Sequence, residues 1–435
     1  MNPPAAGVPR NTLRRLLRLA AILAIALLAF ALLGAWLLQP QRAGKLLLRQ
    51  AGHALGLQVE ASSVDYRLRG TPQLVLHDVT ARQPGADVAL LAAKRAFVSL
   101  PWRTIRARGA DLTVQRIELD APVLDVPALQ AWLETRPKER ETRIPTLTDG
   151  LRIADGRIDN DSWKIDRLDI DIPSLHPDRP LRAHVRGRYL DPPIRAPADL
   201  AITVVHPRRM LTGASTGIAG VGTVTVAEAD WRVPMHVTLS GPLRLGKDSA
   251  LMRPAKLGIA ARYLPRKTEL PFRLGLHGPM AFNNATWRFV PVSVVLDGDG
   301  AIPDASARGS VSIGRTLRLH LDGRIAGWPQ DWPALPPPLS DSRTPMDFAL
   351  DYRGALAFDD LASLAVRRDA TRFDARFRLP AVLEWTAGAK DGSPLPPLDG
   401  RLTTPRLDIV GAQLEGVELE IDDPAIPDTP MPAGK

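Results

Sequence analysis

Alternation of apolar and polar residues is the feature that most constrains the fold of this chain. In the segment TLRLHLDGRI, the apolar residues Leu317, Leu319 and Leu321 are each followed by a polar residue. A β-strand directs successive side chains to opposite faces, so these leucines share one face of a predicted strand. Because helical spacing is rare in the chain, the sequence predicts a mainly β fold. Two further alternating segments contribute the other members of the predicted apolar face: Phe272, Leu274, Leu276, Val417, Leu419 and Ile421.

Length and composition agree with this prediction. A chain of 435 residues with 45% hydrophobic content is able to bury a core, as two or three ordinary domains or as one large β architecture. Its 41 prolines are roughly double the usual share of ~5%, which suits turns and edge strands better than long helices. The absence of cysteine does not decide the cellular compartment.

The charge pattern argues against nucleic-acid binding. The net charge is +9, but arginine and aspartate alternate along the strand-like segments and form no basic stripe with interleaved aromatic residues. The ordinary interpretation is a solvated face of mixed charge. An excess of positive charge also suits contact with anionic phospholipid headgroups.

An apolar segment near the N-terminus predicts a membrane anchor. Residues 19–38 form a run of 20 uncharged, mostly apolar residues, and a helix of that length spans a hydrocarbon core of ~30 Å. A cleaved signal peptide is the alternative, but its apolar region is normally shorter and ends at a small-x-small site, whereas this run ends in WLLQP. The positive-inside rule places residues 1–18 in the cytoplasm, because the span is preceded by Arg10, Arg14, Arg15 and Arg18.

The remainder of the chain divides into three predicted regions. Residues 41–133 are expected to form a short amphipathic helix, several strands and a second helix, PALQAWLE, that buries Leu129, Trp132 and Leu133. Residues 134–150 are a predicted charged linker, and residues 151–435 a meander of strands. Within that meander, a bulge near Asp166 and Arg167 would bring Trp163 and Ile165 to the same face as Leu168, Ile170 and Ile172.

Motifs for catalysis and metal binding have little support. Ser215 is central in GASTG, but a nucleophile elbow needs a strand before it and a helix after it, and a loop and strand are predicted to follow. The DGDG segment at 297–300 lacks the other ligands of a calcium loop and fits a tight turn. We therefore expect no catalytic residue, metal site or cofactor, and no enzyme activity.

Two long segments follow the predicted anchor, LGLQVEASSVDYRLRGTPQLVLHDVTARQPG and FVSLPWRTIRARGADLTVQRIELDAPVLDV. Together with that anchor they resemble the AsmA-like family, whose proteins are related to the chorein-type bridge-like lipid-transfer proteins. The later segments LRIADGRID and GRLTTPRLDIVGAQLEGVELEID resemble downstream strands of the family. A pattern typical of the family is occupied here by Val98, Leu100, Ile105, Leu112, Val114, Ile117, Leu119, Pro122, Leu124 and Val126.

This resemblance implies a fold, a location and a function. The fold is an elongated, curved antiparallel β-sheet with an apolar groove, held at the bacterial inner membrane by a single span, with the bulk of the chain in the periplasm. The implied partners are phospholipids and other envelope proteins, and the implied role is lipid transport and outer-membrane homeostasis. The nine alternating residues of the apolar face would then line a lipid groove.

Two alternatives remain open at this stage. The same alternating strands also suit a closed sandwich, in which the apolar side chains contact one another and no lipid. The protein could also be a structural scaffold or assembly factor that binds envelope proteins along exposed strand edges without transferring lipid. A periplasmic hydrolase is a more distant third alternative.

Overall fold

The computed structural model confirms the mainly β prediction: 63% of the residues that it describes are in strands, and their helices are few and short. Among the residues that the structure describes, no helix is both long enough and apolar enough to cross a bilayer. The predicted anchor at 19–38 lies outside those residues, as does the predicted helix at 45–55 apart from Gly52. The structure describes residues 52, 56–107, 110–135, 144–246, 249–265, 269–284, 286–332, 335, 337, 340–356, 358–388, 396–409 and 412–427.

The chain divides into two compact units. Unit 1 comprises residues 1–138 together with 153–161, and unit 2 comprises 139–152 together with 162–435. The segment 153–161, which falls within the predicted meander of 151–435, therefore belongs to unit 1. The predicted linker at 134–150 contains the end of one helix and a short strand, β8 (Thr146–Leu147).

The strands described in unit 1 form a small sheet, which two short helices, α3 and α4, accompany. Both β1 and β2 pair with β3, β3 pairs with β4, and β4 pairs with β6 and β7, all antiparallel. β7 pairs with β9 in parallel. The elements are β1 (Gln58–Glu60), β2 (Ser63–Arg67), β3 (Gln73–Arg82), β4 (Leu91–Ser99), α3 (Trp102–Arg106), β5 (Thr113–Val114), β6 (Arg116–Asp120), β7 (Val123–Asp125), α4 (Val126–Thr135) and β9 (Leu151–Asp159).

Two predictions for unit 1 need correction. The segment RAFVSLPWRTI, which we expect from its sequence to be one of the strands within 41–133, is not a single strand, because β4 ends at Ser99 and Pro101 directly precedes α3. The predicted helix PALQAWLE is confirmed as α4, and Leu129 and Trp132 pack against a buried cluster as expected. Leu133, however, is 53% exposed and is not among the residues that pack against that cluster.

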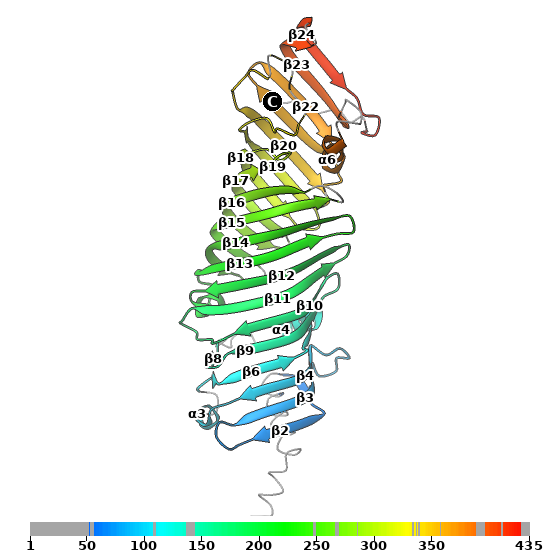
Figure 1. Cartoon of the computed structure of the whole chain (residues 1–435). Coiled ribbons are helices and arrows are strands. Elements are labelled where there is room, and N and C mark those ends of the chain that lie inside the picture. Colours follow the sequence, from blue (N-terminus) through cyan, green and yellow to red (C-terminus); the bar gives the residue numbers. More distant parts are fainter. Residues whose placement is uncertain are drawn as a thin grey trace, which may run out of the picture. The chain divides into compact units, whose positions relative to one another are not determined.

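Unit 2 contains a long antiparallel meander, in which each strand from β10 to β24 pairs with the next (Figure 1). The bounds are β10 (Lys164–Ile172), β11 (Leu181–Asp191), β12 (Ile194–Val204), α5 (Pro207–Leu211), β13 (Thr216–Ala227), β14 (Trp231–Leu245), β15 (Ser249–Pro265), β16 (Leu270–Asn283), β17 (Thr286–Gly298), β18 (Ala305–Ile313), β19 (Leu317–Ile325), β20 (Met346–Gly354), β21 (Ala362–Arg368), β22 (Thr371–Phe377), α6 (Leu379–Gly388), β23 (Leu398–Ile409) and β24 (Ala412–Ile421).

The predicted bulge in β10 is confirmed. The pairing of β10 with β11 shifts register between Asp166 and Asp169, and Arg167 adopts a left-handed backbone conformation with φ of 50°. On either side of the shift, Ile165 and Ile170 are paired with Tyr189 and Val185. Those two partners are an even number of residues apart on one strand, so both isoleucines lie on the same face of the sheet.

A line of register shifts crosses β14 to β18, and we name this line the crease. Each strand from β14 to β17 carries one proline at its shift: Pro242, Pro254, Pro279 and Pro291. A proline has no N–H to donate to the ladder, and a bulge bends the strand that contains it. The prolines therefore explain why the ladder is interrupted at the same place in neighbouring strands. The shifts fall between Ser240 and Leu243, Met252 and Ala255, His277 and Met280, and Phe289 and Val292.

Candidate functional site: the apolar face of unit 2

All nine residues of the predicted apolar face lie on one face of the unit 2 meander. Three are in β16, three in β19 and three in β24. Strand pairing connects them across the sheet: Leu276 lies opposite Val294, and Leu402 lies opposite Leu419. The alternation found in isolated segments is therefore one face of a shared surface.

An unbroken row of apolar or glycine positions runs along this face from β11 to β24. Each member lies directly opposite the next on the neighbouring strand, so their side chains share a face. We name it the long row, and its members are Ala183, Ile202, Gly220, Leu239, Leu257, Leu276, Val294, Ala307, Gly323, Phe348, Val366, Phe373, Leu402 and Leu419.

A second row lies two residues away on the same face and is also apolar. It contains Leu274, which lies opposite Ile259 on β15 and Leu296 on β17. The apolar face is thus several side chains wide over the middle of the meander. The second row comprises Ile170, Val185, Leu200, Gly222, Val237, Ile259, Leu274, Leu296, Ala305, Ile325 and Met346.

Burial varies strongly along the apolar face. At the crease, Val292, Met252 and Phe289 are 1%, 2% and 3% exposed, whereas Leu419 on β24 is 44% exposed. Most other members of the long row are half-buried. Buried residues also occur on this face beyond the crease, such as Leu317 at 6% and Met346 at 3% exposed. We name the buried residues at the crease the crease cluster, which comprises Leu243, Met252, Ala255, Met280, Phe289, Val292, Val294, Ala307 and Val311.

The apolar face has unfilled space beside Gly220. A β-carbon built at Gly220 meets no atom within 4 Å, although the residue lies in the long row between Ile202 and Leu239. A β-carbon built at Gly275, on the opposite face of β16, has its nearest neighbour at 3.9 Å, the carbonyl oxygen of Val295. These two glycines form a matched pair of positions on the two faces.

The opposite face is a lattice of ion pairs between neighbouring strands. Arg324 Nε is 2.8 Å from Asp347 Oδ1, and Arg401 Nη2 is 2.8 Å from Glu420 Oε1. On the same face, His320 Nδ1 is 2.7 Å from a carboxylate oxygen of Asp351, and this hydrogen bond raises the pKa of His320. These ion pairs explain why arginine and aspartate recur along the strands: the two residue types pair with each other on a solvated face.

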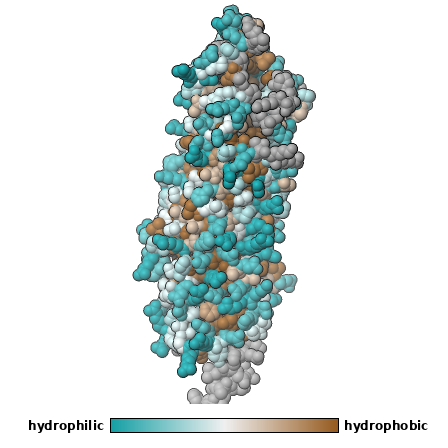
Figure 2. Space-filling view, in the orientation of Figure 1, coloured by the Kyte–Doolittle hydropathy of each residue, from teal (hydrophilic) through white to brown (hydrophobic). Residues whose placement is uncertain are grey.

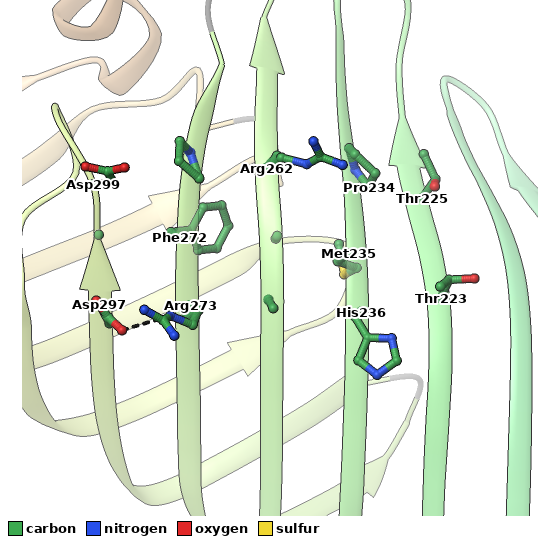
Figure 3. Close-up of a pocket in the computed structure, with 14 residues that line it drawn as sticks. Thr223, Thr225, Pro234, Met235, His236, Arg262, Phe272, Arg273, Asp297 and Asp299 are labelled. Atoms are coloured by element: carbon green, nitrogen blue, oxygen red, sulfur yellow. Dashed lines mark ion pairs between the residues drawn. The ribbon is translucent and has the colours of Figure 1, made fainter.

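A hollow of about 610 Å³ lies on this polar face, across β13 to β17 (Figure 3). Arg273 turns toward Asp297, with Nε 2.9 Å from Oδ2 (Figure 3). Arg262 extends the other way, toward Pro234, and pairs with Glu269 at 3.2 Å. The two guanidinium groups do not converge on the hollow, so we assign no ligand to it.

The weak catalytic motifs of the sequence have ordinary structural surroundings. Ser215 is exposed, with α5 before it and β13 after it, which is the reverse of the order that a nucleophile elbow requires. In the DGDG segment, Asp297 pairs with Arg273. Among the described residues, no group of three or more histidine, aspartate or glutamate side chains is arranged to hold a metal ion.

The molecular surface shows how the two kinds of side chain are distributed. On the side of the molecule shown in Figure 2, apolar surface forms patches that hydrophilic side chains separate. Single apolar residues are also exposed on the polar face, such as Val295 at 58%. The exposed apolar surface on this side is therefore interrupted.

Sequence reasoning missed the crease cluster and two helices of unit 2. The prolines within alternating segments signal the crease, because a proline in a strand pattern indicates a bulge or an edge. Pro207 stands at the start of α5 and Pro380 near the start of α6, and proline in a first turn is a recognised sign of a helix start. The structure thus adds a buried cluster to what the sequence predicts as a uniform face.

Comparison with known proteins gives no match: no family model, curated protein or solved structure matches this chain. The function is therefore argued from the geometry of the chain. The resemblance to AsmA-like proteins supports the function proposed below, but it does not show that the chain belongs to that family.

Proposed function

We propose that the apolar face of unit 2 binds phospholipid acyl chains, and that the protein takes part in lipid transport at the bacterial cell envelope. The observation that carries this proposal is the long row. It is apolar or glycine at every position from β11 to β24, and most of its members keep part of their surface accessible. At a strand spacing of ~4.8 Å the row extends for roughly 60 Å along the sheet.

The energetics of acyl-chain binding suit such a surface. Burying a CH₂ group is worth ~0.8 kcal/mol, so a long acyl chain gains roughly 10 kcal/mol by leaving water for an apolar surface. The gain relative to a bilayer is small, because the bilayer core is equally apolar. A lipid is therefore able to leave a membrane for this face at little net cost while its headgroup stays in solvent.

The location in this proposal follows from the sequence. The apolar run at 19–38 anchors the protein in the inner membrane, and the basic residues before it place residues 1–18 in the cytoplasm. Units 1 and 2 then lie in the periplasm. The resemblance to AsmA-like proteins supports the same location and a role in outer-membrane homeostasis.

Filling the open space at Gly220 tests the proposal. Gly220→Trp places a large side chain on the apolar face where a β-carbon meets no neighbour, and Gly275→Trp places the same side chain on the polar face. We expect the Gly220 variant to retain less co-purified phospholipid per protein than the unmodified chain. The Gly275 variant should retain the normal amount, as measured by mass spectrometry of extracted lipid.

The outcomes separate lipid binding from a general effect of the tryptophan. Equal lipid content in both variants, at normal abundance, would contradict acyl-chain binding on this face. A Gly220→Ala variant controls for the loss of glycine itself, and its lipid content should be close to normal.

A second function is favoured by the edge of the meander. β24 pairs with β23 alone among the described strands, and nearly all of its residues are exposed. An unpaired strand edge is able to accept a strand from another protein, which is the binding mode of an assembly factor or scaffold. A stoichiometric protein partner in a purified complex that contains no lipid would favour this alternative.

A further inference from the structure

Four arginines on the polar face of unit 2 lie on one line of directly opposed residues across β14 to β20. All four are exposed. The other positions of the line are Leu251, Ala281 and Ser312, which carry no charge. Arg318 and Arg353 lie directly opposite each other on β19 and β20. We name these four residues the arginine line: Arg244, Arg288, Arg318 and Arg353.

The arginine line differs from the ion-paired arginines of the same face. In the lattice of ion pairs an arginine lies opposite a carboxylate, as Arg324 lies opposite Asp347. In the part of the chain that the structure describes, the side chains of the arginine line have no ion pair or hydrogen bond. The one carboxylate within two residues of them along their strands is Asp351, which is bonded to His320. Like charges directly opposite each other are destabilising, so the fold itself gains nothing from the two opposed arginines.

The arginine line runs beside one long edge of the meander. Arg244 and Arg353 lie one residue before the ends of β14 and β20. Arg288 and Arg318 lie within two residues of the starts of β17 and β19. Because neighbouring strands are antiparallel, β12, β14, β16, β18 and β20 all end at this edge, which we name the basic edge. Arg315, in the connection between β18 and β19, adds a further exposed arginine to it.

Exposed apolar side chains lie at the same edge. Trp287 directly precedes Arg288 in β17 and is 41% exposed, and its ring centroid lies 4.7 Å from that of Phe282 on β16. Leu211, at the end of α5 in the connection between β12 and β13, is 48% exposed. Tryptophan is enriched where a membrane meets water, and apolar residues beside basic ones are typical of surfaces that lie on a bilayer. The basic edge therefore presents both kinds of side chain that a phospholipid surface accommodates.

We propose that the basic edge docks on the surface of a bilayer that contains anionic phospholipids, with the arginine line bound to lipid phosphate groups. A guanidinium group binds phosphate oxygens in a planar, bidentate geometry, and its positive charge complements the negative surface potential of such a bilayer. The phosphates also supply the negative charge that is missing between Arg318 and Arg353. This inference goes beyond the proposed function, because it concerns the strand ends and needs no acyl chain on the apolar face.

Fluorescence quenching at single positions tests the docking, and the absence of cysteine from the chain permits single labels. Thr316→Cys places a fluorophore at the basic edge, between β18 and β19, and Ala229→Cys places it at the opposite edge, between β13 and β14. Both residues are exposed. The full chain is held in nanodiscs of phosphatidylcholine and mixed with vesicles that carry a quencher on their lipid headgroups. These vesicles consist of phosphatidylcholine alone or of phosphatidylcholine with phosphatidylglycerol.

We expect the label at Thr316 to be quenched only by the vesicles that contain phosphatidylglycerol, and the label at Ala229 to be quenched little by either. Combining Arg288→Gln, Arg318→Gln and Arg353→Gln should abolish the quenching. Each basic residue beside an anionic surface contributes a factor of about five to the binding equilibrium. This variant should fold normally, since it removes repulsion between exposed charges.

The matched control removes the same number of positive charges from paired positions on the same face. It combines Arg186→Gln, Arg273→Gln and Arg324→Gln, each at a position opposite an aspartate. We expect this control to retain most of the quenching, because the arginine line is intact.

Three results would overturn the docking. They are equal quenching with and without phosphatidylglycerol, quenching that survives loss of the arginine line, and equal quenching at the two edges. Binding of inorganic phosphate without quenching by the anionic vesicles would assign a soluble anion to the arginines and would also overturn it. Phospholipid capture at Leu274 on the apolar face measures acyl-chain binding separately, so failure of the docking leaves the proposed function standing.

Discussion

Truncating Phe289 should destabilise unit 2 far more than truncating an equally apolar residue at the end of the meander. Phe289 is 3% exposed and belongs to the crease cluster, between Met280 and Val311 on the neighbouring strands. A buried Phe→Ala substitution removes contacts on all sides and leaves a cavity, at a cost of ~3–5 kcal/mol. We expect Phe289→Ala to lower the free energy of unfolding by about that amount.

Leu419→Ala is the comparison. Three side-chain carbons at ~0.8 kcal/mol each give about 2.4 kcal/mol for a fully buried leucine. Because Leu419 is 44% exposed, the expected cost is roughly 1.3 kcal/mol. Urea unfolding of the purified protein, monitored by the circular dichroism signal of the β-sheet, measures the loss of unfolding free energy for each substitution. Equal costs would refute the reasoning, since a closed sandwich would bury both residues alike.

Three further predictions concern pH, chemistry and topology. The hydrogen bond from Arg188 lowers the pKa of Asp166, so the pair stabilises the fold above the ordinary aspartate pKa and stops doing so as pH falls through the lowered value. Asp166→Asn should therefore lower the free energy of unfolding in urea by up to ~1 kcal/mol at pH 7. The same loss at a pH below the lowered pKa of Asp166 would contradict this pairing. Ser215→Ala should leave the envelope function intact in a complementation assay, and loss of function at normal abundance would restore the hydrolase alternative. A reporter fused after Lys435 should be active only outside the cytoplasm, and activity inside it would overturn the predicted anchor topology.

The mainly β fold was predictable because alternation is a local property of the chain. Each strand of unit 2 that carries residues of the apolar face shows the period of two in its own sequence, as in residues 316–325. The bulge in β10 was predictable for the same reason, since a change of parity between Ile165 and Leu168 requires an extra residue. Local patterns thus gave the strands and their faces.

The burial of the apolar face could not be predicted in the same way. Leu317 and Leu419 look alike in sequence, yet Leu317 is 6% exposed and packs with Tyr352 and Ala362, whereas Leu419 is 44% exposed. The difference depends on how strands far apart in the chain curve around one another. The prolines of the crease are visible in the sequence. That they lie beside one another on neighbouring strands follows only from the register in which β14 to β18 pair.

The photo-crosslinking of neighbouring residues on the two faces of one strand tests lipid binding most directly. Leu274 lies on the apolar face of β16 and Arg273 on its polar face, and the pairs Leu319 with Arg318 and Leu419 with Glu418 repeat this contrast on β19 and β24. A photo-crosslinker at the three leucine positions should capture phospholipid in cells. A crosslinker at Arg273, Arg318 or Glu418 should capture little. Equal capture on both faces, or none at the leucine positions, would contradict the account.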